Sequence, residues 1–214
     1  MARLTIELER PVPLTPLTAA ASRRDVSRRV AHVDITLTTG DGVVVSARAL
    51  VLRRSDLPEP AWAPDPTPAQ VLADEYRADV PAWASGEVPY TYHQHAVEHR
   101  MPPGSAFTTP GPATSWIRLL YPLVAGEETS GLCRVLAAAD FGSGISAIYR
   151  DVHRVGLINA DLTVALHRLP NDEWVRVDAT TTLDPSGSAL CVTRLGDQQG
   201  DLGIATQSLL GLRL

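Results

Sequence analysis

The sequence predicts an α+β fold in which antiparallel strands wrap around a helix. Three observations favour this class. Apolar and polar residues alternate with period two over several runs, one segment carries apolar residues at helical spacing, and turn residues separate the runs. The 214 residues, 44% of them hydrophobic, provide a core for one large domain or two small ones.

Residues 1–54 are predicted to form strands of an antiparallel meander. Apolar residues alternate with polar ones at 4–8, 33–37 and 43–51, and a Thr-Gly-Asp-Gly turn precedes the last of these runs. No helical pattern is present in this part. A sheet with one apolar face must nevertheless bury that face against another layer.

Residues 55–89 are predicted to be a connector. Seven prolines in this stretch exclude a continuous helix or a central strand. A short helix is expected at 69–76, because Pro68 suits a first helical turn and helix-forming residues follow it. The chain is thus divided into a strand section at 1–54, the connector, and a second unit at 90–214.

The second unit is predicted to contain a strand, a helix and then four strands. The first strand is expected at 90–101, before the segment SWIRLLYPL. The helix is expected at 129–141, where Leu132, Leu136 and Ala139 recur at helical spacing, and two following glycines end it. The four strands are expected at 157–168, 173–183, 188–195 and 202–212, with turn residues between them.

Composition excludes several functional classes. The formal net charge is -5 and no run of Lys or Arg exceeds a pair, so neither nucleic acid nor a membrane is an expected partner. The N-terminus lacks the apolar stretch of a signal peptide, and no segment approaches a membrane span, so a cytoplasmic protein is expected. Cys133 and Cys191 have apolar neighbours and are interpreted as core residues.

Several strings in the second half resemble double-hotdog acyl-CoA thioesterases of the acyl-CoA thioesterase II type. In order they are GPATSWIRLLYPLVAGEE, AAADFGSGIS, INADLTVALHRLP followed by EWVRVDATT, and GIATQSLL. The opening strings ARLTIELERPVPLTPL and RRVAHVDITLTTGDGVVVSARALVLR resemble strands of the first half of that family.

The resemblance implies two hotdog units, each an antiparallel sheet wrapped around a long helix. It also implies hydrolysis of an acyl-CoA substrate to free fatty acid and CoA. In that family a helix precedes the first strands, whereas this sequence starts at the strand that should follow the helix. The first hotdog is therefore expected to be incomplete at its N-terminus. Its exposed apolar face predicts self-association as a homo-oligomer, or instability.

The resemblance further implies that Asp140, Asn159 and Gln207 hold the attacking water. Asp140 closes the predicted helix among alanines and Phe141, and apolar surroundings raise a carboxyl pKa and favour a base. Asn159 places an amide where the family often has a hydroxyl. Gln207 shares a strand face with small and apolar residues, so a buried amide there needs a polar partner.

Each of these residues also has a structural interpretation. Asp140 would form hydrogen bonds with the Gly-Ser-Gly turn that follows it. Asn159 would lie on the solvent face of an alternating strand, where Asp161 shares its face and rivals it for the catalytic position. Gln207 would bond to backbone groups.

Other candidate sites are weaker. Gly142 and Gly144 are candidates for backbone N–H donors to an oxyanion, although their alternative role is to end the helix. The Gly-Ser-Gly string is not a serine-hydrolase elbow. His93, His95 and His99 would share one strand face, but no carboxylate or Cys stands at ligand spacing. No metal and no cofactor are expected.

Two further functions stay open beside the hydrolase. One is a non-catalytic acyl-CoA-binding or assembly module of the same fold. The other is a hotdog dehydratase, which would need a His paired with an acidic residue, and no His lies on the second-half helix.

The phosphates of CoA favour arginines near a channel mouth, and the second half offers Arg118, Arg134, Arg150, Arg154 and Arg168.

Overall fold

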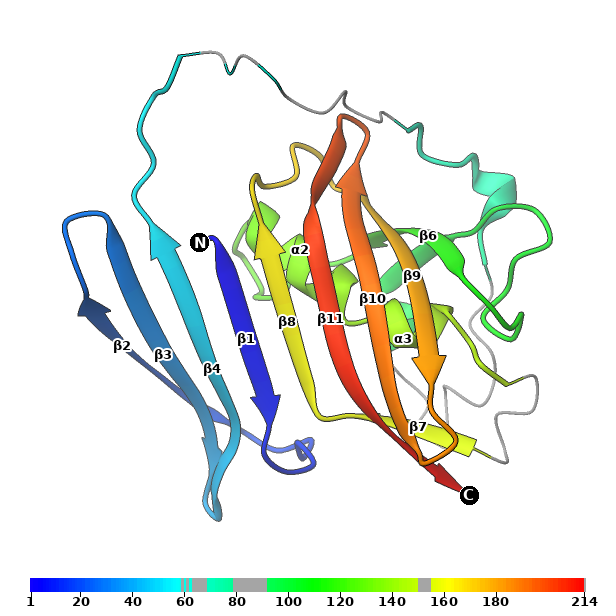
Figure 1. The fold of residues 1–214 in the computed structure, drawn as a ribbon, viewed down its shortest axis with the longest axis horizontal. Helices are drawn as coiled ribbons and strands as arrows, with labels where there is room; N and C mark the ends of the chain where they lie inside the picture. The colour runs from blue at the N-terminus through cyan, green and yellow to red at the C-terminus, as the bar shows by residue number, and fades with distance from the viewer. Residues whose placement is uncertain (59, 61, 63–68, 79–91, 150–154, 214) are drawn as a thin grey trace.

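One curved antiparallel sheet dominates the computed structural model (Figure 1). The structure describes residues 1–58, 60, 62, 69–78, 92–149 and 155–213. Within these residues, the main path of the sheet runs β2-β3-β4-β1-β8-β11-β10-β9-β6-β5, and β7 also pairs with β11. The strands are β1 (Arg3–Leu8), β2 (Thr18–Asp25), β3 (Val30–Thr39), β4 (Gly42–Leu52), β5 (Val97–Arg100), β6 (Ala113–Leu119), β7 (Val155–Asn159), β8 (Asp161–Leu166), β9 (Val175–Leu183), β10 (Ser188–Asp197) and β11 (Gly200–Arg213).

The N-terminal strand joins the two halves of the sheet. Strands β2, β3 and β4 form the predicted meander, but β1 pairs with β4 on one side and β8 on the other. Leu4 lies beside Ala49 and Val164, and all three side chains are buried. The prediction that β1 belongs to the meander is wrong, because its apolar face extends the core of the second half.

A bulge changes the face of one predicted position. Val45 pairs with Leu37, and Val43 pairs with Thr38, so Val44 is an extra residue on β4. The side chain of Val44 is buried, whereas Val43 is 38% exposed. The expected alternation therefore holds from Val45 onward but fails at Val43.

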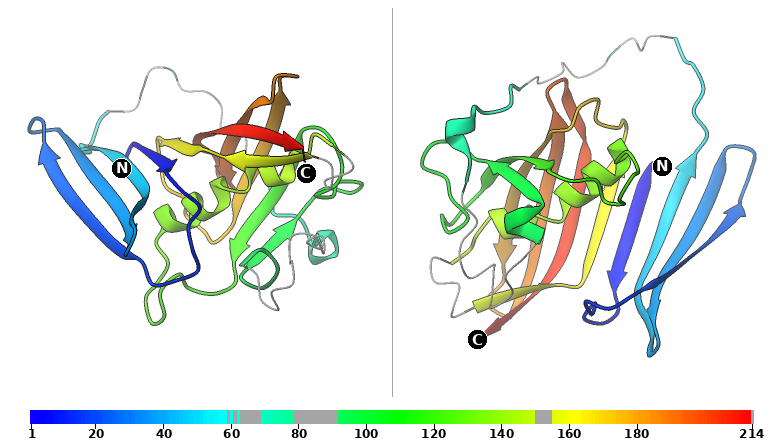
Figure 2. Two further views of the ribbon diagram at one scale, coloured as in Figure 1. Left: turned by 90° about the horizontal axis from the view of Figure 1, so that it is seen from below. Right: turned by 180° about the vertical axis from the view of Figure 1, so that it is seen from behind.

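The helices of the second half lie against the inner side of the curved sheet (Figure 2). Helix α2 (Gly131–Ala139) begins at Ser130, whose hydroxyl accepts the N–H of Cys133 at 3.2 Å. Val135, Ala138 and Ala139 are its buried residues, and it packs against β6, β9 and β10. The single turn α3 (Gly142–Ile145) follows, and packs against β6, β9, β10 and β11. None of the helices described is long and apolar enough to cross a membrane.

Two expectations near the connector need correction. Residues 92–95 form a helical turn, α1 (Tyr92–His95), rather than the start of a strand, and only 97–100 join the sheet as β5. The helix expected at 69–76 is reduced to a 3-10 turn at Asp74–Tyr76. The chain leaves this turn because the next residues bond to β5, where the N–H of Ala78 donates to the carbonyl of His99 at 2.9 Å.

The first half of the sheet has no helix of its own among the described residues. Figure 2 shows β2, β3 and β4 extending beyond α2 and α3. Val33, Ile35 and Leu37 of β3 lie on the face that β1 continues into the core, and all three are only half-buried. An apolar layer that the second half covers with α2 is thus partly open to solvent in the first half.

Candidate active site

The candidate site lies where α2 ends. Asp140 follows the last residue of α2 in a helical conformation, and its N–H donates to the carbonyl of Ala138. Phe141 is buried and continues into α3. The backbone therefore turns only slightly between the two helices, and the Asp140 side chain is presented at their junction.

Gly142 allows α3 to approach the sheet closely. A Cβ atom at this position would lie 2.4 Å from Thr193 Oγ1 and 3.0 Å from Gln207 Oε1. The prediction that Gly142 ends the helix is wrong, because it begins α3 and has no positive φ. Gly144, by contrast, has open space where its Cβ would stand.

The structure brings the side chains of Asp140, Asn159 and Gln207 together. Asn159 Nδ2 donates to Asp140 Oδ1 at 3.5 Å, which is at the long end for a hydrogen bond. Gln207 Nε2 donates to the backbone carbonyl of Asp140 at 3.1 Å. One helix end and two strands, β7 and β11, thus meet at Asp140, where Asn159 bonds to the carboxylate and Gln207 to the backbone carbonyl.

Gln207 holds the turn between the helices. Its Oε1 accepts the N–H of Ser143 at 2.9 Å, while its Nε2 bonds to Asp140 as described above. The side chain is 1% exposed. The structural interpretation of Gln207 expected such hydrogen bonds to backbone groups. The amide nitrogen Nε2 carries two hydrogens, and one of them donates to the Asp140 carbonyl.

A strand bulge turns Asn159 toward Asp140. Asn159 pairs with Leu209, whereas Thr163 pairs with Thr206, so one extra residue separates β7 from β8. Asn159 therefore lies on the same inner face of the sheet as Leu209, which is buried. The preceding Ile158 points to the other face and is 53% exposed. The strand expected at 157–168 is therefore interrupted, and the alternative that placed Asn159 on its solvent face is wrong.

Asp161 does not share the face of Asn159. The bulge lies between the two residues, and the Asp161 carboxylate accepts the backbone N–H of Ser208 at 2.6 Å. Its role in the structure is to bind the neighbouring strand. The rival position that the alternating pattern offered is therefore not part of the site.

Three ionisable groups meet at the end of α2. Desolvation by the surrounding residues raises the pKa of the Asp140 carboxyl although the residue as a whole is exposed, and His93 and then the Asn159 amide act in the opposite direction. Burial lowers the pKa of His93, and the Asp140 charge opposes that shift. Burial and the Asp140 charge both raise the pKa of Tyr92. The imidazole and the phenol of α1 are thus near enough for their charges to interact with the carboxylate.

Sequence reasoning missed His93 as a site residue. The three histidines do not share a strand face, since His93 and His95 belong to α1 and His99 to β5. The His93 ring packs edge-on against Phe141 with centroids 4.8 Å apart, next to Asp140. Within the described residues, no group of three or more His, Cys, Asp or Glu side chains is arranged to hold a metal.

Most of the candidate arginines for CoA are engaged within the protein. Arg118 bonds to Glu98 and Glu173 and lies over Trp174. Arg168 forms a bidentate pair with buried Asp197, at 2.6 and 2.7 Å. Arg134 bonds to the carbonyl of Asp172 and lies near Glu128, and Arg150 and Arg154 lie outside the described residues.

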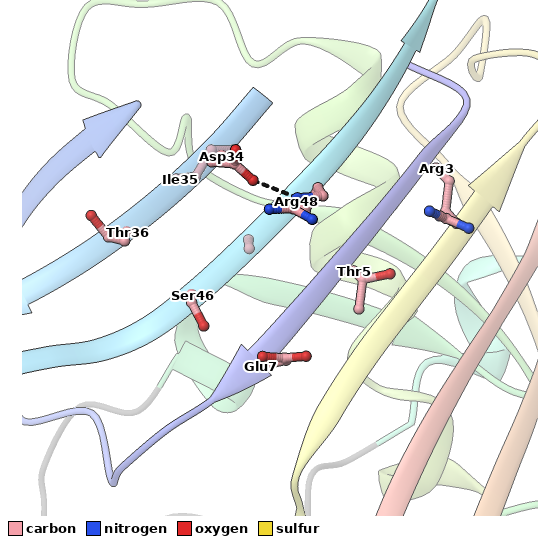
Figure 3. Close-up of a pocket in the computed structure, with 9 residues that line it drawn as sticks. Arg3, Thr5, Glu7, Asp34, Ile35, Thr36, Ser46 and Arg48 are labelled. Atoms are coloured by element: carbon pink, nitrogen blue, oxygen red, sulfur yellow. Dashed lines mark hydrogen bonds and ion pairs between the residues drawn. The ribbon is translucent and has the colours of Figure 1, made fainter. Parts of the chain in front are cut away.

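A groove of about 440 Å³ lies elsewhere, on the outer face of the first half of the sheet (Figure 3). Polar side chains of β1, β3 and β4 line it, among them Arg3, Glu7 and Arg48. Arg48 is paired with Asp34 across the two strands. None of the three residues that meet at the end of α2 lines this groove.

Comparison with known proteins gives one family match and many structural matches. The family model of the acyl-CoA thioesterase C-terminal domain matches residues 56–210. A search of curated proteins finds no match. Two similar solved structures are a hot dog fold protein of unknown function from Alicyclobacillus acidocaldarius and an acyl-CoA thioesterase II from Mycobacterium marinum.

Both structures share the fold over the whole chain. The first has 18% identity and a TM-score of 0.67, covering 100% of this chain and 78% of that chain. The second has 18% identity and a TM-score of 0.66, covering 100% of this chain and 80% of that chain. At this identity the likeness establishes the α+β hotdog architecture.

Proposed function

Because the chain belongs to the family of the acyl-CoA thioesterase C-terminal domain, we propose that it hydrolyses acyl-CoA to free fatty acid and CoA. The family and the hotdog fold support a thioesterase-like function in general. The observation that carries the specific proposal is the bond of the Asn159 amide to the Asp140 carboxylate, beside the Gln207 amide that bonds to the backbone carbonyl of the same residue.

In the proposed reaction Asp140 is the general base. Its carboxylate takes a proton from a water molecule while the water oxygen attacks the carbonyl carbon of the thioester. The tetrahedral intermediate then collapses, the C–S bond breaks, and the CoA thiolate leaves and takes up a proton. The raised pKa of Asp140 suits this role, because a base is most effective when its pKa approaches the working pH.

The two amides direct the attack in this proposal. Asn159 donates toward the same carboxylate that accepts the proton, so a water bound to Asp140 lies within reach of its amide. Gln207 fixes the backbone of Asp140 and offers its remaining N–H to the water. For the oxyanion, Gly144 is the better of the two glycine candidates, because Gly142 is buried against Thr193 and Gln207.

Replacing Asp140 with Asn tests the proposal. A positioned general base contributes roughly 10²–10⁴-fold to the rate, so Asp140→Asn should lower kcat by a factor in that range. The measurement is release of free CoA thiol from acyl-CoA substrates of several chain lengths. The matched control is Asp161→Asn, which removes a nearby carboxylate that the bulge turns away from the site.

The outcomes separate hydrolysis from binding alone. Thermal unfolding of each variant checks that the fold is retained. Wild-type turnover in Asp140→Asn would show that the base is misassigned. If the wild-type protein releases no thiol, yet a non-hydrolysable acyl-CoA analogue raises its Tm, the protein is an acyl-CoA-binding module.

One observation favours a dehydratase as the second candidate. The His93 ring packs against Phe141, next to Asp140, and the charges of His93 and Asp140 interact, so an imidazole and a carboxyl group lie near each other although no His was expected on the helix. Such a pair removes an α-proton and protonates a leaving hydroxyl. Incubation with 3-hydroxyacyl-CoA distinguishes the candidates, since a dehydratase forms an α,β-unsaturated thioester and a hydrolase releases thiol.

A further inference from the structure

Ser143 connects the two amides of the candidate site. Its backbone N–H donates to Gln207 Oε1 at 2.9 Å, and its hydroxyl donates to Asn159 Oδ1 at 3.3 Å. Its side chain is half-buried on α3, between β7 and β11. Ser143 thus contacts both strand residues of the site, Asn159 and Gln207. In the sequence it stood out only as part of a Gly-Ser-Gly string.

The hydroxyl of Ser143 bonds to the Oδ1 end of the Asn159 amide, while the Nδ2 end faces Asp140. The oxygen and nitrogen ends of an amide are similar in size, and a rotation by half a turn exchanges an acceptor for a donor. With Oδ1 occupied by the Ser143 hydroxyl, Nδ2 points to the Asp140 carboxylate. The opposite orientation would place the amide oxygen against the negative charge.

This constraint matters most after Asp140 has taken a proton. A carboxylate selects the N–H end of an amide by its charge, but a neutral carboxyl group accepts or donates and selects neither end. The Ser143 hydroxyl carries no charge in either state, and its bond to Asn159 does not depend on the charge of Asp140. This bond therefore limits the movement of the Asn159 amide when Asp140 is protonated.

Ser143 itself is held by the packing of α3. Gly142 lies against Thr193 and Gln207, and the Ser146 hydroxyl donates to the Gly142 carbonyl at 2.8 Å. The same Ser146 hydroxyl lies 2.6 Å from that of Thr181 on β9. Bonds to β9 and β11 thus fix the turn that presents the Ser143 hydroxyl.

We propose that Ser143 is a positioning residue of the thioesterase reaction, which acts by orienting the Asn159 amide toward Asp140. The inference rests on the proposed function and deepens it. Ser143→Ala tests it, because this change removes the hydroxyl and keeps the backbone bond to Gln207. Loss of one such hydrogen bond should lower kcat about threefold to tenfold, with KM little changed.

The pH profile provides a readout that a merely structural role would not move. Donation from Asn159 lowers the pKa of Asp140, so a misoriented amide raises that pKa. In Ser143→Ala the acid limb of kcat/KM should therefore shift to higher pH. The other ionisable groups that face Asp140, His93 and Tyr92 of α1, stay in place in this variant.

A double-mutant cycle identifies the residue through which Ser143 acts. In an Asn159→Ala background the substitution Ser143→Ala should cause no further loss, because the amide that it orients is absent. Ser143→Thr keeps a hydroxyl and should restore most of the rate. Ser208→Ala is the matched control, since this exposed serine lies on the other face of β11, next to Gln207.

Three results would overturn the role of Ser143: full activity in Ser143→Ala, an unmoved acid limb, or losses that add in the double variant. Each of them leaves the proposed function intact, provided that Asp140→Asn still lowers kcat in the range given above. Full activity in Asp140→Asn overturns the proposed role of Asp140 instead, and absence of thiol release by the wild-type protein overturns the proposed function. The two failures are therefore distinguishable in one set of variants.

Discussion

At the scale of single residues, the core contains a histidine that stays neutral. His99 is 1% exposed, its Nδ1 lies 3.2 Å from Ser115 Oγ, and its ring packs edge-on against Phe107 and Phe141. Its Nε2 is buried without a partner within the described residues. Burial lowers the pKa of His99 from 6.5 to about 3, with a smaller contribution from His93.

This histidine should make the stability of the fold depend on pH. Between its folded pKa of about 3 and the ordinary value of 6.5, the unfolded chain binds a proton that the folded chain does not. The free energy of unfolding should therefore fall as pH is lowered through this window. Chemical denaturation at several pH values measures the slope, and His99→Phe should reduce it by up to one proton. An unchanged slope in this variant would contradict the assignment.

At the scale of elements, the position of α3 depends on the absence of a side chain at Gly142. The two short distances to Thr193 and Gln207 leave no room for a methyl group. Moving α3 away from β10 and β11 would break the bond between Ser143 and Gln207. The short helix is thus part of the site because it packs directly against the sheet.

Gly142→Ala should accordingly impair the site more than the same change at Gly144. Overpacking of a core typically costs about 1–3 kcal/mol, so we expect a lower Tm together with a loss of thioesterase activity. Gly144→Ala meets nothing within 4 Å and should leave the Tm close to that of the wild type. Equal Tm values for the two variants would argue against the close approach of α3.

At the scale of the whole molecule, the apolar face of the first half of the sheet is unusual because no helix among the described residues covers it. Val33, Ile35 and Leu37 are only partly buried on the face that α2 covers in the second half. Contiguous apolar surface of this kind is uncommon on monomers and favours association. We therefore expect the protein to self-associate through this face.

Light scattering coupled to sizing measures this property. The substitution Val33→Glu places a charge on the open face and should lower the apparent mass. Thr36→Glu adds the same charge to the outer face of β3, where Thr36 lines the polar groove, and should not. A monodisperse monomer for the wild-type protein, or equal masses for the two variants, would contradict the expectation.

The sequence by itself determined the fold class, most of the strands, the helix and three polar residues that meet in space. These features follow from local patterns: period-two alternation, helical spacing, and motifs that resemble a family. The three residues lie on different elements, so their spacing in the chain carried no geometric information. Their convergence was predicted from the resemblance alone.

Tertiary structure decided which face each residue occupies. One extra residue between β7 and β8 turns Asn159 inward and Asp161 outward, and alternation along one strand does not reveal it, because register depends on the partner strand. Likewise β1 bridges both halves, and Ser143 and His93 lie at the site although no local pattern assigned them a role there. Such contacts form because packing against the sheet outweighs local preference, and only the folded chain specifies that packing.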